Sequence, residues 1–90
     1  MTLRIVLPIT NEKGLHARAS AKFVETVERH DARAWVRRGD QRVAGDSIMG
    51  LLTLAAARGT EIEVEIEGPE ADALAEALRA LVAGRFGEPR

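Results

Sequence analysis

One stretch of the sequence alternates without a break between two kinds of side chain. Residues 61–67 read Glu-Ile-Glu-Val-Glu-Ile-Glu, with charged and β-branched apolar residues in strict succession. Because successive side chains of a strand point to opposite faces of a sheet, this strand needs one buried face and one face in water. Such a strand is typical of an antiparallel sheet whose helices cover a single side. The segment therefore restricts the fold to a half-covered sheet.

Turn and helix signals divide the rest of the 90-residue chain into further elements. We predict strands at 3–9, 34–37 and 41–44, helices from Ala17 to about Arg29 and from Ser47 to near Gly59, and a last helix that opens at Pro69 and ends at Gly84. This order is satisfied by an α+β open-faced sandwich, a four-stranded antiparallel sheet covered on one face by three helices (βαββαβα). We expect a single domain over residues 1–90, with a flexible tail at about 86–90.

The composition limits the function classes. Thirteen basic and fourteen acidic residues leave the net charge near zero, so neither nucleic acid nor an anionic membrane is indicated as a partner. The chain has no cysteine, which excludes disulfides and thiolate metal sites. Its apolar run near residue 1 is too short to span a bilayer, so we expect no membrane insertion. We predict neither a metal nor a cofactor.

Two residues at one predicted helix start break the local rules for that position. His16 lies at the N-cap, where histidine is a poor choice compared with Ser, Thr, Asp or Asn. Arg18 lies in the first turn, where the helix dipole disfavours a cation. An anion held by the free amides of Ala17 and Arg18, and countered by the arginine side chain, would resolve both conflicts. His16 could itself carry that anion, as a phosphoryl group on a ring nitrogen.

The same residues also have an ordinary interpretation. A lone histidine at a helix start can be a solvent-exposed loop residue, and Arg18 could continue a water-facing charged stripe with Lys22. No Asp or Glu stands immediately beside His16 to form a catalytic pair. His30, at the other end of the helix, is interpreted as a cation near the helix C-terminus. Spacing alone leaves both interpretations of His16 open.

Two separated motifs resemble those of a known family. GLHARASAKFV (14–24) and SIMGLLTLAA (47–56) closely resemble segments of the HPr family, the histidine-containing phosphocarrier proteins of the bacterial phosphotransferase system. The resemblance covers the whole chain and implies a cytoplasmic carrier that is not an enzyme. It implies that His16 accepts a phosphoryl group, on Nδ1, from phosphoenolpyruvate-charged enzyme I and passes it to an EIIA-type protein. Arg18 matches the arginine that accompanies this histidine in the family.

The first motif departs from the family pattern at one position. Ala19 stands where the family usually has proline. Proline would fix the first helical turn, but alanine also suits a first turn, so the site should be retained. The resulting HARAS form is more similar to the nitrogen-type or regulatory branch of the family than to the main sugar-transport branch.

The second motif implies regulatory and docking residues. Ser47 matches the serine that HPr kinase/phosphorylase phosphorylates in some branches, and it is also a suitable helix N-cap. Asp46 precedes it, where the family more often has a neutral or basic residue, and this carboxylate would repel a phosphate. Ile48, Met49 and Leu52 are expected to dock partner proteins, the alternative being that this short helix is simply buried on two sides.

Two other function classes stay open on the sequence. The chain could be an HPr-like regulatory interaction module that does not relay phosphate. It could also be a ferredoxin-like domain that binds a small anion at the same helix end, although only His16 and Arg18 are evident as polar groups for such a pocket. We expect a monomer whose encounters with its partners are transient.

Overall fold

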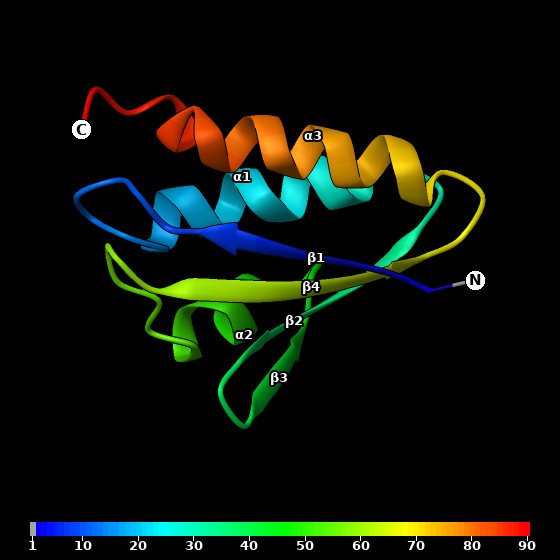
Figure 1. The fold of residues 1–90 in the computed structure, drawn as a ribbon, viewed down its shortest axis with the longest axis horizontal. Coiled ribbons are helices and arrows are strands. Elements are labelled where there is room, and N and C mark those ends of the chain that lie inside the picture. Colours follow the sequence, from blue (N-terminus) through cyan, green and yellow to red (C-terminus); the bar gives the residue numbers. More distant parts are fainter. Residues whose placement is uncertain (1) are drawn as a thin grey trace.

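The computed structural model describes residues 2–90 and contains a four-stranded sheet with helices. The elements are β1 (Leu3–Pro8), α1 (Ala17–Glu28), β2 (Arg33–Arg38), β3 (Gln41–Ala44), α2 (Ile48–Thr53), β4 (Glu61–Glu67), α3 (Ala71–Ala83) and a 3₁₀ turn, η1 (Arg85–Gly87). The strands run antiparallel in the order β1-β4-β2-β3, and α1 and α3 lie side by side along one face (Figure 1). The predicted α+β open-faced sandwich is confirmed.

The alternating strand β4 lies in the interior of this sheet and forms the centre of the core. Ile62, Val64 and Ile66 are completely buried, whereas the glutamates between them are half-exposed on the other face. Val64 is paired with Ile5 of β1 and with Val36 of β2. Each apolar side chain buried in this way stabilises the fold by roughly 1.5–3 kcal/mol. The helices supply the other half of the core through Phe23, Val24, Val27, Leu74, Leu78 and Val82.

Helix α2 is shorter than predicted. It ends at Thr53 rather than near Gly59, although Leu54 and Ala56 beyond it are still buried. The apolar run continues because the chain stays in contact with the core after leaving the helix. Ala56 O accepts a hydrogen bond from Leu15 N at 2.9 Å, which ties this segment to the loop before α1. The predicted helix was too long because Leu54 and Ala56 are buried like helix residues although the chain around them is not helical.

Helix α3 begins slightly later than predicted and ends where expected. Its first helical residue is Ala71 and its N-cap is Glu70, so Pro69 lies before the helix rather than in its first turn. The acidic Asp72 in the first turn complements the positive end of the helix dipole. Gly84 is the C-cap, as predicted. No helix of residues 2–90 has both the length and the apolar character needed to span a membrane.

The segment expected to be a flexible tail is packed against the domain instead. We call residues 85–90 the C-terminal strap. Phe86 is only 1% exposed and belongs to the core. Lys22, expected on a water-facing stripe of α1, is half-buried, and its Nζ donates to Phe86 O at 2.6 Å. Burial of the Phe86 ring therefore offsets the conformational entropy that residues beyond a helix usually keep.

The start of α2 is capped as predicted, which leads to a stability test. Ser47 Oγ accepts a hydrogen bond from Gly50 N at 3.0 Å. Replacing a serine N-cap by alanine costs about 1 kcal/mol. We therefore expect Ser47→Ala to lower the free energy of unfolding by about 1 kcal/mol, measured by urea denaturation. Ser47→Asp keeps a capping oxygen and should lose much less; equal losses in both variants would contradict a capping role.

Candidate functional site

His16 occupies the N-cap of α1 but does not act as a cap. Its backbone is extended (φ −77°, ψ −177°), and its side chain accepts no capping hydrogen bond from any described residue. The first helical bond runs from Ser20 N to His16 O at 2.8 Å. The amides of Ala17 and Arg18 precede that bond, so the helix itself offers them no acceptor. A half-buried imidazole thus stands beside two free N–H groups.

The loop that leads into His16 is held in one conformation. Gly14 has φ +65°, a region that side chains rarely adopt. A Cβ at this position would also lie 2.5 Å from Ala56 O. The buried Asn11 donates from Nδ2 to Gly14 O at 2.8 Å. The backbone therefore turns sharply into the site, and this turn requires glycine.

A carboxylate that sequence reasoning missed contacts the histidine. Glu88, in the C-terminal strap, places Oε2 2.5 Å from His16 Nε2, while its Oε1 accepts from Asn11 Nδ2 at 3.0 Å. The Glu88 side chain is 17% exposed. Figure 1 shows the strap at the same end of the molecule as the loop between β1 and α1. No neighbouring residue of His16 in the sequence indicated this pair, because the two partners are 72 positions apart.

The surroundings of Glu88 favour its ionised form. Burial raises the pKa of this carboxyl, but the hydrogen bonds from His16 and Asn11 and the positive charges of His16 and Lys13 act in the opposite direction. The net result is a pKa below the ordinary value of 4.5. Glu88 is therefore ionised at neutral pH, and each of its two oxygens accepts a hydrogen bond, one from Asn11 and one from His16.

This lowered pKa predicts how the strap responds to acid. A carboxyl whose pKa is lower in the folded state stabilises that state above its unfolded pKa, and the contribution is lost as the pH falls through the folded pKa. We expect wild type to be more stable than Glu88→Gln above pH 4.5, with the gap closing as the solution becomes more acidic than that. Urea denaturation of both proteins across this range measures the gap. A gap that widens in acid would contradict the prediction.

Arg18 is placed where an anion at the helix end could reach it. Its side chain is exposed, and it forms no ion pair with any of residues 2–90. By contrast, Arg29 at the other end of α1 is paired with Glu25 at 2.7 Å. His30 is also engaged there, because its Nδ1 donates to Thr26 O at 2.8 Å. Arg18 thus keeps its charge available beside His16.

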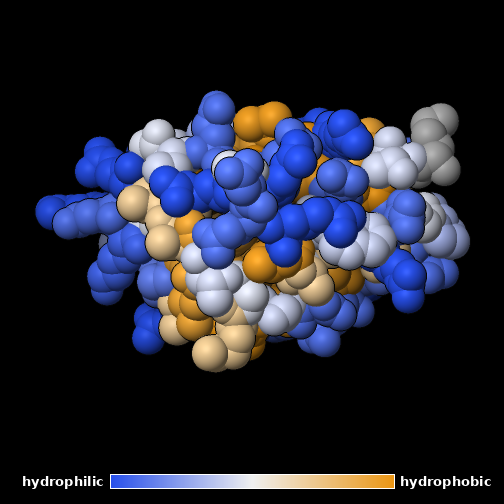
Figure 2. All heavy atoms as spheres, turned by 90° about the horizontal axis from the view of Figure 1, so that it is seen from below, coloured by the Kyte–Doolittle hydropathy of each residue, from blue (hydrophilic) through white to orange (hydrophobic). Residues whose placement is uncertain are grey.

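A shallow apolar hollow borders the histidine. It has a volume of about 280 Å³. Its lining is Lys13, Leu15, His16, Leu52, Ala55, Ala56 and Ala57. On the same helix as Leu52, Ile48 is 39% exposed and Met49 is 72% exposed. Figure 2 shows hydrophobic side chains reaching the surface on the underside of the molecule, where α2 lies. Of the predicted docking residues, Leu52 lines the hollow beside His16, whereas Ile48 and Met49 do not, and neither does Ser47.

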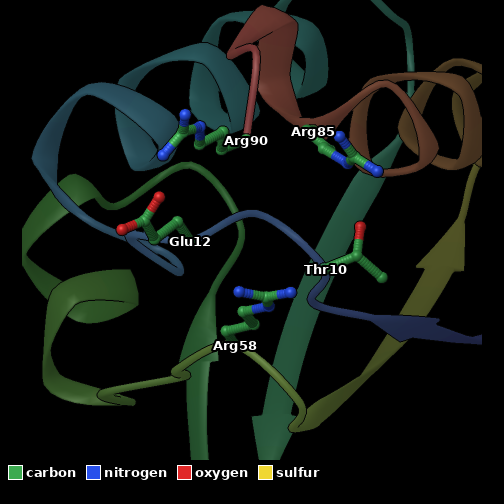
Figure 3. Close-up of a pocket in the computed structure, with 5 residues that line it drawn as sticks. All are labelled: Thr10, Glu12, Arg58, Arg85 and Arg90. Atoms are coloured by element: carbon green, nitrogen blue, oxygen red, sulfur yellow. The ribbon is translucent and has the colours of Figure 1, made fainter.

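A second hollow, of about 340 Å³, gathers positive charge near the loop that leads to His16 (Figure 3). It is lined by Thr10, Glu12, Arg58, Arg85 and Arg90. Arg85 and Arg90 extend from the strap, Arg58 from the loop before β4, and Glu12 from the loop between β1 and α1. Within residues 2–90, none of the three arginines forms an ion pair. Their field would attract an anionic donor or acceptor.

Comparisons with known proteins agree with this geometry. Residues 4–84 match the family model described as the PTS HPr component phosphorylation site. The phosphocarrier protein HPr of Neisseria meningitidis serogroup A is 48% identical over 86 residues, covering 96% of this chain and 97% of the relative. The crystal structure of HPr-C-His from Thermoanaerobacter tengcongensis has a TM-score of 0.92 at 32% identity, covering 98% of this chain and 99% of that one.

The identities do not favour the nitrogen-type branch that the HARAS form predicted. The phosphocarrier protein NPr of Klebsiella oxytoca is 37% identical over 86 residues, below the 48% of the Neisseria HPr. The family itself is not in doubt, since its model spans most of the chain and the relatives match nearly end to end. The chain belongs to the HPr family of the bacterial phosphotransferase system, whose members carry phosphoryl groups and are not themselves catalysts.

Proposed function

We propose that His16 accepts the phosphoryl group from phosphoenolpyruvate-charged enzyme I and passes it to an EIIA-type protein. The observation that carries this proposal is the half-buried imidazole at the N-terminus of α1. It lies beside two amides that the helix leaves free and beside Arg18, which has no ion-pair partner among residues 2–90. It lies within the segment that matches the family's phosphorylation-site model. We place the protein in the cytoplasm on the strength of this relay, and we expect a monomer, which light scattering would test.

The proposed chemistry needs positioning and charge neutralisation more than acid–base catalysis. A neutral imidazole is nucleophilic at its unprotonated nitrogen. Phosphoryl transfer spreads negative charge over the transferred oxygens, which fixed N–H donors and cations stabilise. The amides of Ala17 and Arg18 are suitable donors, and the Arg18 guanidinium is a suitable cation. Together they would hold the phosphoryl group on His16 without a metal of the protein's own.

Intact-mass spectrometry tests the proposal. The protein is incubated with phosphoenolpyruvate, magnesium and enzyme I, with the sugar-type and nitrogen-type enzymes in parallel. We expect an acid-labile gain of one phosphoryl group, and the enzyme that reacts faster would assign the branch. A regulatory module that does not relay phosphate predicts no gain with either enzyme, and that result would overturn the proposal.

We also propose that Ile48, Met49 and Leu52 form the surface that docks enzyme I. Replacing a residue at the centre of such an interface commonly weakens the binding free energy by more than about 1 kcal/mol. A loss of about 1.4 kcal/mol corresponds to a tenfold change in affinity. We therefore expect Met49→Glu to raise the KM of enzyme I for this protein about tenfold, with kcat little changed. Val6→Glu is the matched control, because Val6 is also an exposed apolar residue (56%) but lies on β1. Equal effects in both variants would contradict docking at α2.

Ser47 is proposed as a site of regulatory phosphorylation by HPr kinase/phosphorylase. Its position at the start of α2 supports the proposal, since free amides at a helix start favour a phosphate. The neighbouring carboxylate of Asp46 opposes it, and the Ser47 hydroxyl is already engaged in capping. Incubation with purified kinase and ATP should add an acid-stable phosphate to wild type and none to Ser47→Ala. A kinase that labels another HPr but not this protein would exclude the proposal.

A further inference from the structure

We propose that Glu88 is a positioning residue for phosphoryl transfer, which keeps the proton of His16 on Nε2 and leaves the lone pair of Nδ1 to the phosphoryl group. This inference rests on the proposed role of His16 as the acceptor. The contact that carries it joins Glu88 Oε2 to His16 Nε2 at 2.5 Å. Since a carboxylate can only accept, the imidazole nitrogen that faces it must be the donor.

The carboxylate is held in place by a second, buried partner. Its other oxygen, Oε1, accepts from Asn11 Nδ2 at 3.0 Å, and Asn11 is completely buried. The same Nδ2 also donates to Gly14 O at 2.8 Å, in the turn that leads into His16. One amide group therefore links the carboxylate to the backbone that carries the histidine. Both oxygens of Glu88 are used, so the side chain has little freedom to rotate away.

The backbone that carries Glu88 is anchored as well. Phe86 is buried in the core, and its carbonyl accepts from Lys22 Nζ at 2.6 Å. Gly87 then turns the chain with φ +80°, and Glu88 N donates to Arg85 O at 2.9 Å. A loose terminus would bring a carboxylate to the histidine only occasionally. These contacts place it there as part of the fold, in the way that a supporting group orients a reacting one.

The proposed role follows from the chemistry of a neutral imidazole. One ring nitrogen carries the proton and the other carries the lone pair. With the proton held on Nε2, the lone pair of Nδ1 forms the new bond to phosphorus. The bond between phosphorus and the donor atom of enzyme I breaks, and its electron pair stays with that atom. The Nε2 proton is not transferred, and the charge that the ring gains is offset by Glu88.

Two variants test the contact between Glu88 and His16. Glu88→Ala removes both, whereas Glu88→Gln keeps the shape but has a single acceptor oxygen for the two donors, His16 Nε2 and Asn11 Nδ2. Glu28→Gln is the charge-matched control, because Glu28 is exposed at the far end of α1. We expect both Glu88 variants to lower the kcat of phosphorylation by enzyme I about 10- to 100-fold, the range for a misoriented reacting group, with KM nearly unchanged. The control should behave as wild type.

A spectroscopic readout distinguishes positioning from mere stability. In wild type at alkaline pH, ¹⁵N NMR should show a protonated Nε2 and an unprotonated Nδ1, and the Nε2 proton should exchange slowly with water. In Glu88→Ala this proton should exchange rapidly, while the remaining amide spectrum keeps the pattern of a folded domain. Glu88→Gln, which preserves the volume of the side chain, covers the case in which the alanine variant unfolds.

The outcomes are distinct from those of the proposed function. If wild type gains no phosphoryl group, the role of His16 fails, but the Nε2 proton still reports whether the contact with Glu88 exists. If wild type is phosphorylated and kcat is unchanged in both Glu88 variants, the positioning role is wrong. A faster reaction in Glu88→Ala would also overturn it, because the strap would then be a cover over His16. An Nε2 that is unprotonated in wild type would have the same consequence.

Discussion

His16→Ala is expected to remove all acid-labile phosphorylation by enzyme I. The reason is chemical, since alanine has no nitrogen to form a bond with phosphorus. The loss should be complete rather than partial, because no other nucleophile shares the combination of the α1 N-terminus, Arg18 and Glu88 among the described residues. Intact-mass spectrometry before and after acid treatment measures the effect.

The other histidine provides a matched control. His30 follows the C-terminal end of α1, where its Nδ1 is occupied by Thr26 O. A phosphoryl group there would meet the negative end of the helix dipole instead of free amides. We therefore expect His30→Ala to be labelled as fully as wild type. Labelling that survives in His16→Ala but disappears in His30→Ala would contradict the prediction, because His30 would then be the phosphorylated residue.

Phe86→Ala is expected to produce the largest loss of stability. Truncation of a buried phenylalanine typically costs about 3–5 kcal/mol, and a domain of this kind has only about 5–15 kcal/mol to lose. Phe86 is 1% exposed, so its replacement by alanine would leave a cavity in the core where the phenyl ring had been. Its backbone lies at φ +56°, a strained conformation for a non-glycine residue that burial of the ring has to offset. Urea denaturation measures the change.

The control for this experiment lies within the same segment. Pro89 is exposed, so Pro89→Ala removes little buried surface and should change the unfolding free energy by less than about 0.5 kcal/mol. A loss below about 1 kcal/mol in Phe86→Ala would mean that the strap is the loose tail that the sequence suggested. A large loss would establish it as part of the domain.

The elements with a clear period were predictable from the sequence. Residues 61–67 form the strand that their alternation indicated, and the amphipathic pattern after His16 forms α1 almost to the predicted end. Both depend on local side-chain spacing, which the sequence displays directly. The end of α2 was not predictable in this way. Leu54 and Ala56 are buried by contacts with a distant loop, and an apolar run does not reveal whether it is helical.

The site was predictable only in part. His16 and Arg18 could be recognised because each violates a rule of helix ends, and violations of that kind concentrate at functional sites. Glu88 violates no local rule and follows a glycine in a segment without periodicity. Its position depends on Phe86, and the sole sequence signal was that a large aromatic side chain stands in a supposed tail. A pair formed across 72 positions can be found only once the fold brings its partners together.

The strand order also constrains how the protein can be made in the cell. β1 is synthesised first, yet its partner in the sheet is β4, and β4 is also the neighbour of β2. While a ribosome is still translating residues before 61, the nascent chain can form α1 and the β2–β3 hairpin but has no place to bury β1. Closing so long a loop is slow and leaves apolar surface exposed meanwhile. Folding of the sheet must therefore wait until β4 and Phe86 have been synthesised, because only then can β1 be paired and buried.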